Sequence, residues 1–294
     1  MNIPVKTLKS GFSLPVYGLG TWEMGGRWEA DVSNDEAEIA AIKAAIDHGV
    51  THLDTAESYG AGHAEELIAE AIKGYDRSKL FIASKVSAQN QRYDDLLRAC
   101  EASLKRLGTD YLDMYMPHRF PEPGIDIKDT MRALDRLMDE GMIRNIGFCN
   151  LTVNRLQAAQ ACTNHQIVCN QLEYSLQFRE AEAKGVVEYC QQNDVMVVAW
   201  GPLHKGAMEQ AGILEEMAEK YGKTPYQIAI NWLISQPNVV TIPKTTQAAH
   251  LEENLGALGW NLSAEDTDRL TREFPNQQTI SQRVSLDYAA DVQP

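Results

Sequence analysis

The chain has 294 residues, 44% of them hydrophobic, and carries a net charge of −14. This acidic balance argues against broad binding to nucleic acids or acidic membranes, which needs a positive field, although a local basic cluster can still hold an anionic ligand. The first residues lack the apolar core of a signal peptide, and no run approaches the roughly 18 apolar residues of a membrane span. We therefore expect a cytoplasmic protein without nucleic-acid or membrane partners.

Strand and helix signals alternate along the chain after an initial hairpin. The hairpin is expected where KSG separates VKTL from FSLP. Apolar runs that predict strands lie at 17–21, 50–54, 80–85, 111–116, 143–149, 167–171, 195–200 and 239–243. Helices are expected before residue 50 and near 63–73, 93–106, 128–140, 152–161, 180–193 and 213–235.

The first helix carries signals for both of its ends. Ser33 and Glu36 have the spacing of a capping box, in which each side chain bonds the other residue's backbone amide. Isoleucines then recur at helical intervals, and Gly49 can end the helix in the left-handed conformation.

Eight evenly spaced strand–helix units favour a closed (β/α)8 barrel. Continuous apolar, β-branched runs are typical of strands that helices cover on both faces. The competing fold is a doubly wound open sheet, but no GxGxxG follows any strand, because GLGTWE at 18–23 and GAGHAE at 60–65 both lack the third glycine. No linker or charge shift divides the chain, so we expect one domain over 1–294 with the hairpin plugging the barrel's amino-terminal end.

Four titratable residues, Asp54, Tyr59, Lys85 and His118, follow the ends of three predicted strands. Barrel chemistry takes place at the carboxyl end of the strands, so these side chains are expected on one face. Tyr59 is the best placed acid for protonating a developing alkoxide. Lys85 would lower the phenol's pKa, Asp54 would hold Lys85 charged, and His118 would orient a carbonyl oxygen.

Each of these residues also has a structural interpretation. Asp54 could cap the next helix, Tyr59 could be a rim aromatic, and Lys85 could reach solvent. His118 alone is more often packed or hydrogen-bonded than catalytic. Taken together, these structural interpretations are less convincing, because four unrelated structural roles would have to place all four side chains on one face of the barrel by chance.

The order Asp, Tyr, Lys, His resembles the aldo-keto reductase family, and the resemblance runs through nearly the whole chain. The segments that carry it are GLGTW (18–22), DTAESYG (54–60), SKV (84–86), GFCN (147–150), NQLEYS (170–175), WGPL (200–203) and IPKTTQAAHLEEN (242–254). The resemblance implies NAD(P)H-dependent reduction of small aldehydes and ketones, with Tyr59 as the proton donor.

The resemblance also implies a cofactor site. Asn150 and Gln171 would hold the nicotinamide carboxamide, and the flat face of Trp200 would stack on the nicotinamide ring. Lys244, with the hydroxyls of Thr245 and Thr246 and the following helix start, would bind the adenosine phosphate. Further cofactor contacts are expected at Gly201, Pro202, Leu203, His250, Glu253 and Asn254.

Two departures from the family pattern concern the cofactor. Cys149 stands where many members have serine, so one contact to the carboxamide is weaker. His250 stands where NADPH-preferring members often have an arginine, so discrimination for the 2′-phosphate is weaker. We therefore expect NADPH binding through Lys244 with some tolerance for NADH.

The substrate side offers three candidates. Arg119 stands where many relatives have tryptophan, and we interpret it as a guanidinium that favours acidic carbonyl compounds, against the alternative of a solvent-facing rim residue. Trp22 and Trp28 are expected apolar walls, with Phe120 a weaker candidate. The short segment between Leu203 and Ile213 and the short polar tail after about 275 suggest an open mouth and broad specificity.

Two other classes of protein stay open at this point. A barrel lyase could use Lys85 as a Schiff-base nucleophile, although Asp54 opposes this by keeping the amine protonated. A non-catalytic barrel could keep the cofactor without turnover. No metal site is expected, and the five cysteines, with no CxxC, are best explained as reduced and mostly buried.

Overall fold

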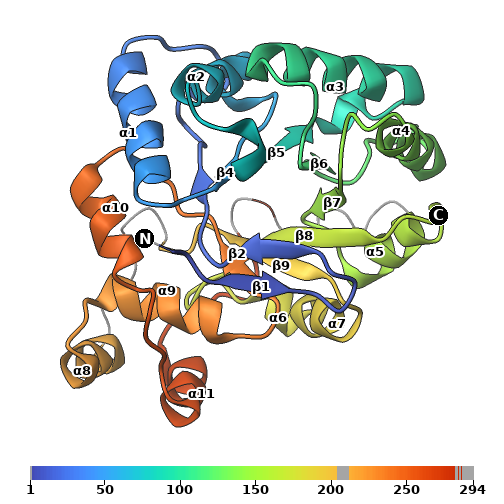
Figure 1. Cartoon of the computed structure of the whole chain (residues 1–294). Coiled ribbons are helices and arrows are strands. Elements are labelled where there is room, and N and C mark those ends of the chain that lie inside the picture. The colour runs from blue at the N-terminus through green and yellow to red at the C-terminus, as the bar shows by residue number, and fades with distance from the viewer. Residues whose placement is uncertain (1, 204–211, 282–283, 285, 287–294) are drawn as a thin grey trace.

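The computed structural model describes residues 2–203, 212–281, 284 and 286. Its centre is an eight-stranded parallel sheet in the sequential order β3 to β10 (Figure 1). The strands are β3 Leu19–Gly20, β4 His52–Asp54, β5 Phe81–Val86, β6 Met114–Pro117, β7 Ile146–Cys149, β8 Ile167–Glu173, β9 Met196–Trp200 and β10 Val239–Thr241. All eight predicted strands are therefore present, within a few residues at each end.

The sheet closes into a barrel through backbone contacts between its first and last strands. Tyr17, just before β3, forms a parallel bridge with Thr241 of β10, and the Gly18 amide donates to the Thr241 carbonyl at 2.9 Å. The Gly20 amide continues this ladder to the Pro243 carbonyl at 3.2 Å. The predicted (β/α)8 barrel is confirmed, and the doubly wound alternative is wrong.

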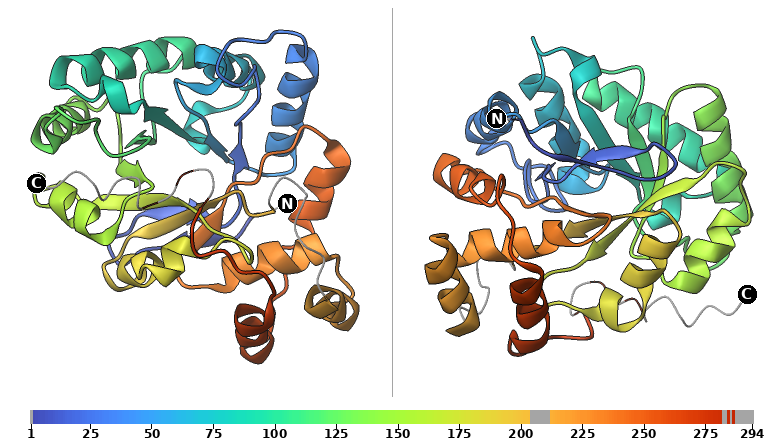
Figure 2. Two further views of the ribbon diagram at one scale, coloured as in Figure 1. Left: turned by 180° about the vertical axis from the view of Figure 1, so that it is seen from behind. Right: turned by 60° about the horizontal axis from the view of Figure 1, so that its bottom comes forward.

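Helices surround the barrel between consecutive strands (Figures 1 and 2). They are α1 Asp35–Asp47, α2 His63–Ala71, α3 Tyr93–Leu107, α4 Ile127–Asp139, α5 Val153–Gln160, α6 Glu180–Ala183, α7 Val186–Gln192, α8 Gly212–Tyr221, α9 Pro225–Ser235, α10 Ala248–Leu255 and α11 Ala264–Glu273, with short 3₁₀ turns η1 Tyr59–Gly62, η2 Arg77–Lys79 and η3 Ala88–Asn90. Amphipathic helices such as α3 and α4 bury one face against the strands and expose the other.

Two helix predictions were wrong in detail. α1 begins after Asn34, which makes no side-chain capping bond, so Ser33 and Glu36 form no capping box. The predicted helix 180–193 is two helices, because Gly185 lies between them with φ of +69°, a left-handed conformation that interrupts the helical ladder. Gly49 does adopt the expected left-handed conformation, with φ of +95°.

The hairpin of β1 Val5–Thr7 and β2 Ser13–Pro15 covers the amino-terminal end of the barrel. It lies in front of β8 and β9 in Figure 1 and behind them in the opposite view of Figure 2. The Asp194 carboxylate, just before β9, accepts from the backbone amides of Lys9 and Ser10 at 2.7 and 2.8 Å. Leu8 and Leu14 pack against the barrel's interior side chains. The carboxyl end of the strands is thereby left for chemistry.

Candidate active site

Three side chains are bonded together at the carboxyl end of β4 and β5. The Lys85 Nζ atom lies 2.5 Å from Asp54 Oδ1, 2.7 Å from the Thr55 carbonyl oxygen and 3.3 Å from the Tyr59 hydroxyl. Lys85 is fully buried and Asp54 is 2% exposed. The structure therefore brings the predicted phenol, ammonium and carboxylate into one cluster, and Asp54 caps no helix.

Local backbone geometry positions these groups. Leu53 packs into the outer core, and because neighbouring strand residues face opposite sides, Asp54 faces the barrel interior. Tyr59 begins the turn η1, where Gly60 has φ of +54°. A Cβ atom on Gly60 would lie 2.1 Å from the Gly25 carbonyl oxygen, so only glycine permits this close approach of the two loops.

His118 follows β6 and lies beside the tyrosine. Its imidazole ring is 5.6 Å from the Tyr59 ring in an edge arrangement, and its Nδ1 atom is 3.5 Å from the Ser58 hydroxyl. Its backbone amide donates to the Val86 carbonyl at 2.9 Å, which anchors the loop at the end of β5. All four residues of the predicted quartet thus line the same end of the barrel.

Burial and charge set the protonation of the cluster. Burial alone disfavours the Lys85 ammonium, but Asp54 and Tyr59 together raise the pKa of Lys85 above its ordinary value. Burial raises the pKa of Tyr59 to about 12, and the nearby Lys85 charge offsets only part of this effect. Lys85 does act to lower the tyrosine pKa, as predicted, but the net shift is upward because desolvation of the phenolate outweighs the ammonium.

The imidazole is held neutral. Burial, with the positive charges of Lys85 and Arg119, holds the pKa of His118 well below its usual range. A neutral imidazole beside a protonated phenol gives two groups that can donate to one substrate oxygen. The cluster can therefore orient a carbonyl and supply it with a proton.

The predicted carboxamide-binding residues lie beside this cluster. Gln171, in β8, donates from Nε2 to Asp54 Oδ2 at 2.8 Å, across the barrel. Asn150, directly after β7, adopts a left-handed φ of +59° and accepts at Oδ1 from Trp200 Nε1 at 3.2 Å. Cys149 makes only a long contact of 3.9 Å with Gln171 Oε1. Amide groups and an indole ring thus meet at one wall of the site.

A second polar region follows β9 and β10. Lys244 is exposed, Thr245 is buried and Thr246 is half-buried, and they precede α10. No side chain caps the start of α10 and its first turn holds no acidic residue, so its free amides suit an anionic group. These donors fit a phosphate-bearing cofactor.

The remaining predicted cofactor residues surround α10 or follow β9. His250 is exposed, Glu253 is half-buried, and Asn254 is buried with its side-chain amide 3.5 Å from the Tyr17 hydroxyl. Pro202 is buried, and Gly201 and Leu203 are half-buried directly after Trp200. Asn254 is thus held by a protein contact in this structure.

The predicted substrate walls form an aromatic cluster over Tyr59. The Trp22 ring lies 4.9 Å from the Tyr59 ring and 4.8 Å from the Trp28 ring. Trp28 is 60% exposed, so it covers the outer side of the cluster. Arg119 is exposed, and Phe120, half-buried, packs beneath the Arg155 guanidinium at 4.3 Å.

Three supporting contacts were not predicted. The Thr55 carbonyl accepts from Lys85, and the Gln171 amide bonds Asp54. Asn170 bonds both the amide and the carbonyl of Leu151, at 3.2 and 3.0 Å, and so fixes the loop that carries Asn150. Asn170 begins the NQLEYS segment, which carries part of the family resemblance. Its membership of that segment was the sequence signal that could have marked it as a supporting residue.

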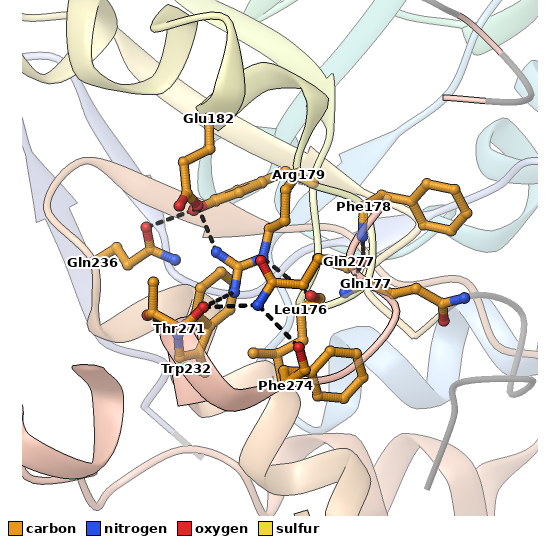
Figure 3. Close-up of polar contacts among 12 residues, drawn as sticks. Leu176, Gln177, Phe178, Arg179, Glu182, Trp232, Gln236, Thr271, Phe274 and Gln277 are labelled. Carbon is orange, nitrogen blue, oxygen red and sulfur yellow. Dashed lines mark hydrogen bonds and ion pairs between the residues drawn. The ribbon is translucent and has the colours of Figure 1, made fainter. Parts of the chain in front are cut away.

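A separate network after β8 is structural (Figure 3). The Arg179 guanidinium bonds Glu182 at 2.6 Å and the Leu176 carbonyl at 3.0 Å, and lies over the Trp232 ring at 4.2 Å. The Arg179 amide donates to the Gln278 carbonyl at 2.7 Å, which pairs the start of the tail with this loop. Arg179 therefore links β8, α9 and the tail.

Other features lie away from the chemistry or outside the described residues. A cavity of about 440 Å³ opens at the amino-terminal end of the barrel, lined in part by Phe12, Phe81 and His165. Among the described residues, no group of His, Cys, Asp and Glu side chains forms a metal site, and no helix has the length and apolar character to cross a membrane. The predictions for the segment after Leu203 and for the end of the tail fall mostly outside the described residues.

The fold and the clustered side chains define a (β/α)8-barrel enzyme. Residues 17–272 match the Aldo/keto reductase family, and the chain belongs to this family. It is 36% identical over 269 residues to methylglyoxal reductase of Escherichia coli (strain K12), covering 90% of this chain and 92% of that protein. It is 35% identical over 266 residues to glyoxal reductase of Bacillus subtilis (strain 168), covering 90% of each. The protein is therefore an oxidoreductase of the aldo-keto reductase type.

Solved structures show the same fold. A thermostable aldo-keto reductase in complex with the inhibitor epalrestat superposes with a TM-score of 0.89 and 43% identity, covering 92% of this chain and 99% of that one. An aldo/keto reductase from Klebsiella pneumoniae in complex with NADP and acetate gives a TM-score of 0.84 and 34% identity, covering 96% of this chain and 98% of that one.

Proposed function

We propose that this protein catalyses the NADPH-dependent reduction of small aldehydes and ketones to alcohols, with Tyr59 as the proton donor. The observation that carries the proposal is the bonded set at the end of β4 and β5, in which the Lys85 ammonium lies 3.3 Å from the Tyr59 hydroxyl and is paired with Asp54. The Klebsiella pneumoniae relatives were solved with NADP or NADPH, which supports the choice of cofactor.

The roles of the chain's residues follow from their chemistry. The Tyr59 hydroxyl and the neutral His118 imidazole donate hydrogen bonds to the two lone pairs of the substrate carbonyl oxygen. These two bonds fix the direction of the carbonyl group. The nicotinamide, when bound, supplies the hydride to the carbonyl carbon. Tyr59 gives its proton to the oxygen, and the Lys85 ammonium stabilises the phenolate that remains. Asp54 keeps that ammonium charged and oriented.

Cofactor binding divides between two ends of the dinucleotide. Asn150 and Gln171 offer donors and acceptors to the carboxamide, and Trp200 offers a flat face to the ring. Lys244, the hydroxyls of Thr245 and Thr246, and the free amides of α10 bind the phosphate end. Further contacts come from the segment after Trp200 and from α10, at Gly201, Pro202, Leu203, His250, Glu253 and Asn254. The exposed His250 gives weaker 2′-phosphate selection than an arginine, so NADH is tolerated.

The substrate is a small carbonyl compound that enters beside an aromatic wall. Trp22 and Trp28 lie over Tyr59, and the related proteins named for methylglyoxal and glyoxal reduction act on small dicarbonyls. We place the protein in the cytoplasm and assign it no nucleic-acid or membrane partner.

A turnover screen tests this function. The purified protein is mixed with NADPH or NADH and a panel of aldehydes, ketones, keto acids and sugars, and cofactor absorbance is followed with the alcohol product identified. We expect carbonyl-dependent oxidation of NADPH. Absence of turnover with every carbonyl compound, with NADPH still quenching Trp200 fluorescence, would show a non-catalytic barrel instead. A borohydride-trapped adduct on Lys85 would show a lyase.

A further inference from the structure

The arginines in the described part of the chain fall into two groups by their partners. Most make salt bridges with carboxylates, and these are Arg77, Arg98, Arg106, Arg132, Arg136, Arg144, Arg179, Arg269 and Arg272. Within the described ranges, four make none, and these are Arg27, Arg92, Arg119 and Arg155. In a chain with 41 acidic residues against 27 basic ones, carboxylate partners are abundant, so the location of the unpaired group is informative.

All four unpaired arginines follow strands at the carboxyl end of the barrel. Arg27 lies between β3 and α1, Arg92 between β5 and α3, Arg119 just after β6, and Arg155 in α5 after β7. Most of the paired arginines lie on outer helices or before strands, and Arg179, which follows β8, is buried against Glu182 (Figure 3). The arginines without carboxylates therefore gather at the end that carries Tyr59.

One of them adjoins a reactive group, and a second packs on the same loop. The charge of Arg119 acts on the adjacent His118 imidazole, and the Arg119 carbonyl accepts from the buried Gln91 side chain at 2.9 Å, which fixes its backbone. Arg155 lies over the ring of Phe120, the residue that follows Arg119. Two guanidinium groups thus belong to, or pack on, the loop that begins at His118.

A third arginine approaches from the other side of the tyrosine. The Arg27 guanidinium lies 6.0 and 5.9 Å from the Trp22 and Trp28 rings, and its carbonyl accepts from the Gly60 amide at 3.1 Å. Trp22 contacts Tyr59 directly. A guanidinium group therefore borders the aromatic wall as well as the His118 side.

Three of the four arginines are separated from the phosphate end of the cofactor site. Around the barrel Arg92, Arg119 and Arg155 follow β5, β6 and β7, whereas Lys244 and α10 follow β10; only Arg27 follows a strand, β3, that neighbours β10. Guanidinium groups bind carboxylates and phosphates through parallel hydrogen bonds, and a cluster of like charges at a site mouth concentrates ligands of opposite charge.

We propose that the preferred carbonyl substrate carries a second, anionic group, a carboxylate or a phosphate, which Arg119 and Arg155 bind while Arg27 and Arg92 attract it to the mouth. The proposal rests on the proposed carbonyl reduction and narrows its substrate class.

Matched substrate pairs test the proposal in the wild-type enzyme. With NADPH, 4-oxobutanoate is compared with its methyl ester, and glyceraldehyde 3-phosphate with glyceraldehyde. We expect at least about a tenfold higher kcat/KM for the charged member of one pair. That preference should shrink when salt rises from about 0.05 M to about 0.5 M, because added ions screen the arginines. Which pair shows the preference distinguishes a carboxylate from a phosphate.

Variants assign the effect to residues. In Arg119→Gln/Arg155→Gln the charged-to-neutral ratio of kcat/KM should fall about tenfold, mainly through KM of the charged substrate. Arg98→Gln, which removes a paired arginine on α3, is the control and should leave the ratio unchanged. A rise in KM for NADPH with an unchanged substrate ratio would show that the arginines serve the cofactor, and would overturn the proposal.

The remaining outcomes are also decisive. Equal kcat/KM for charged and neutral members in the wild type would overturn the anionic-substrate proposal while leaving carbonyl reduction intact. Failure to oxidise NADPH with any of the four compounds but turnover with other carbonyl compounds would overturn the anionic-substrate proposal alone. Failure with the four compounds and with the whole wider carbonyl panel would overturn the proposed function itself.

Discussion

Lys85 and Asp54 form an ion pair almost wholly removed from water, and its energetics explain the site's protonation. Removing either partner of such a pair leaves an uncompensated buried charge, which costs about 3–5 kcal/mol. The second oxygen of Asp54 bonds Gln171, so both carboxylate oxygens are satisfied. The pair therefore maintains an ammonium beside Tyr59 at every physiological pH.

A buried histidine, His52, is expected to make the folded protein less stable in acid. His52 is fully buried, neither ring nitrogen has a hydrogen-bond partner among the described residues, and burial lowers the pKa of His52 to about 4. A Cβ atom on Gly18 would lie 2.7 Å from its ring, so the imidazole has little freedom to move. The folded state therefore resists protonation that the unfolded state accepts near pH 6.5.

The sign of the pH effect follows directly. As the pH falls from about 6.5 to about 4, the unfolded chain takes up a proton at His52 that the folded chain does not, which removes up to about 3 kcal/mol of stability. We expect His52→Leu to lose correspondingly less unfolding free energy than the wild type over this range in urea titrations. Above pH 7 the plots of unfolding free energy against pH should run parallel for the wild type and the variant. Parallel curves at acid pH as well would contradict the lowered pKa.

Single residues also show what the sequence could and could not predict. Asp54, Tyr59, Lys85 and His118 were identifiable because each lies at or just after the carboxyl end of a strand, and parallel strands bring these ends together. The rise in the Tyr59 pKa could not be predicted from the sequence, because it depends on burial by distant segments such as the Trp22 loop. The bond between Gln171 and Asp54 spans 117 positions and required the closed barrel.

Among the elements, α10 combines a free amino terminus with a preceding lysine. Its start holds no side-chain cap, and Lys244 and Thr245 lie just before it. In the proposed cofactor site the helix dipole and the ammonium would act on the same anion, so we expect the loss of Lys244 to weaken phosphate binding without altering the nicotinamide end.

Lys244→Ala should raise KM for NADPH by about tenfold and KM for NADH by less, with kcat at saturation nearly unchanged. In the wild type, the preference for NADPH should stay below about a thousandfold, because His250 lacks the fixed fork of an arginine. Lys73→Ala, which removes an exposed lysine paired with Glu70 on α2, is the control. Equal effects on both cofactors would place Lys244 away from the 2′-phosphate.

Element ends were harder to predict than element existence. The strands were found from their apolar runs, but the break at Gly185 and the start of α1 depend on contacts outside those segments. α11 was not predicted at all, although Ser263 caps it through the Asp266 amide. The sequence of α11 has few apolar residues, so its periodicity is weak. The helix packs against α8 and α9, and these contacts could not be read from the segment alone.

For the whole molecule, we infer that residues 1–294 form one domain, because a single closed sheet organises the described helices and the hairpin. Urea unfolding followed by tryptophan fluorescence and by circular dichroism should give coincident single transitions. NADPH at about 100 times its Kd should raise the unfolding free energy by about 2.7 kcal/mol. Two separated transitions, only one of them shifted by NADPH, would show two units.

The most direct test of the central claim compares the wild type with Tyr59→Phe in single-turnover oxidation of NADPH by methylglyoxal. The phenol's proton is the one contribution that this change removes, so we expect the rate to fall by about 100-fold or more. NADPH should still quench Trp200 fluorescence to the same extent in the variant. A Tyr59→Phe enzyme that oxidises NADPH at close to the wild-type rate would contradict the proposed role of Tyr59.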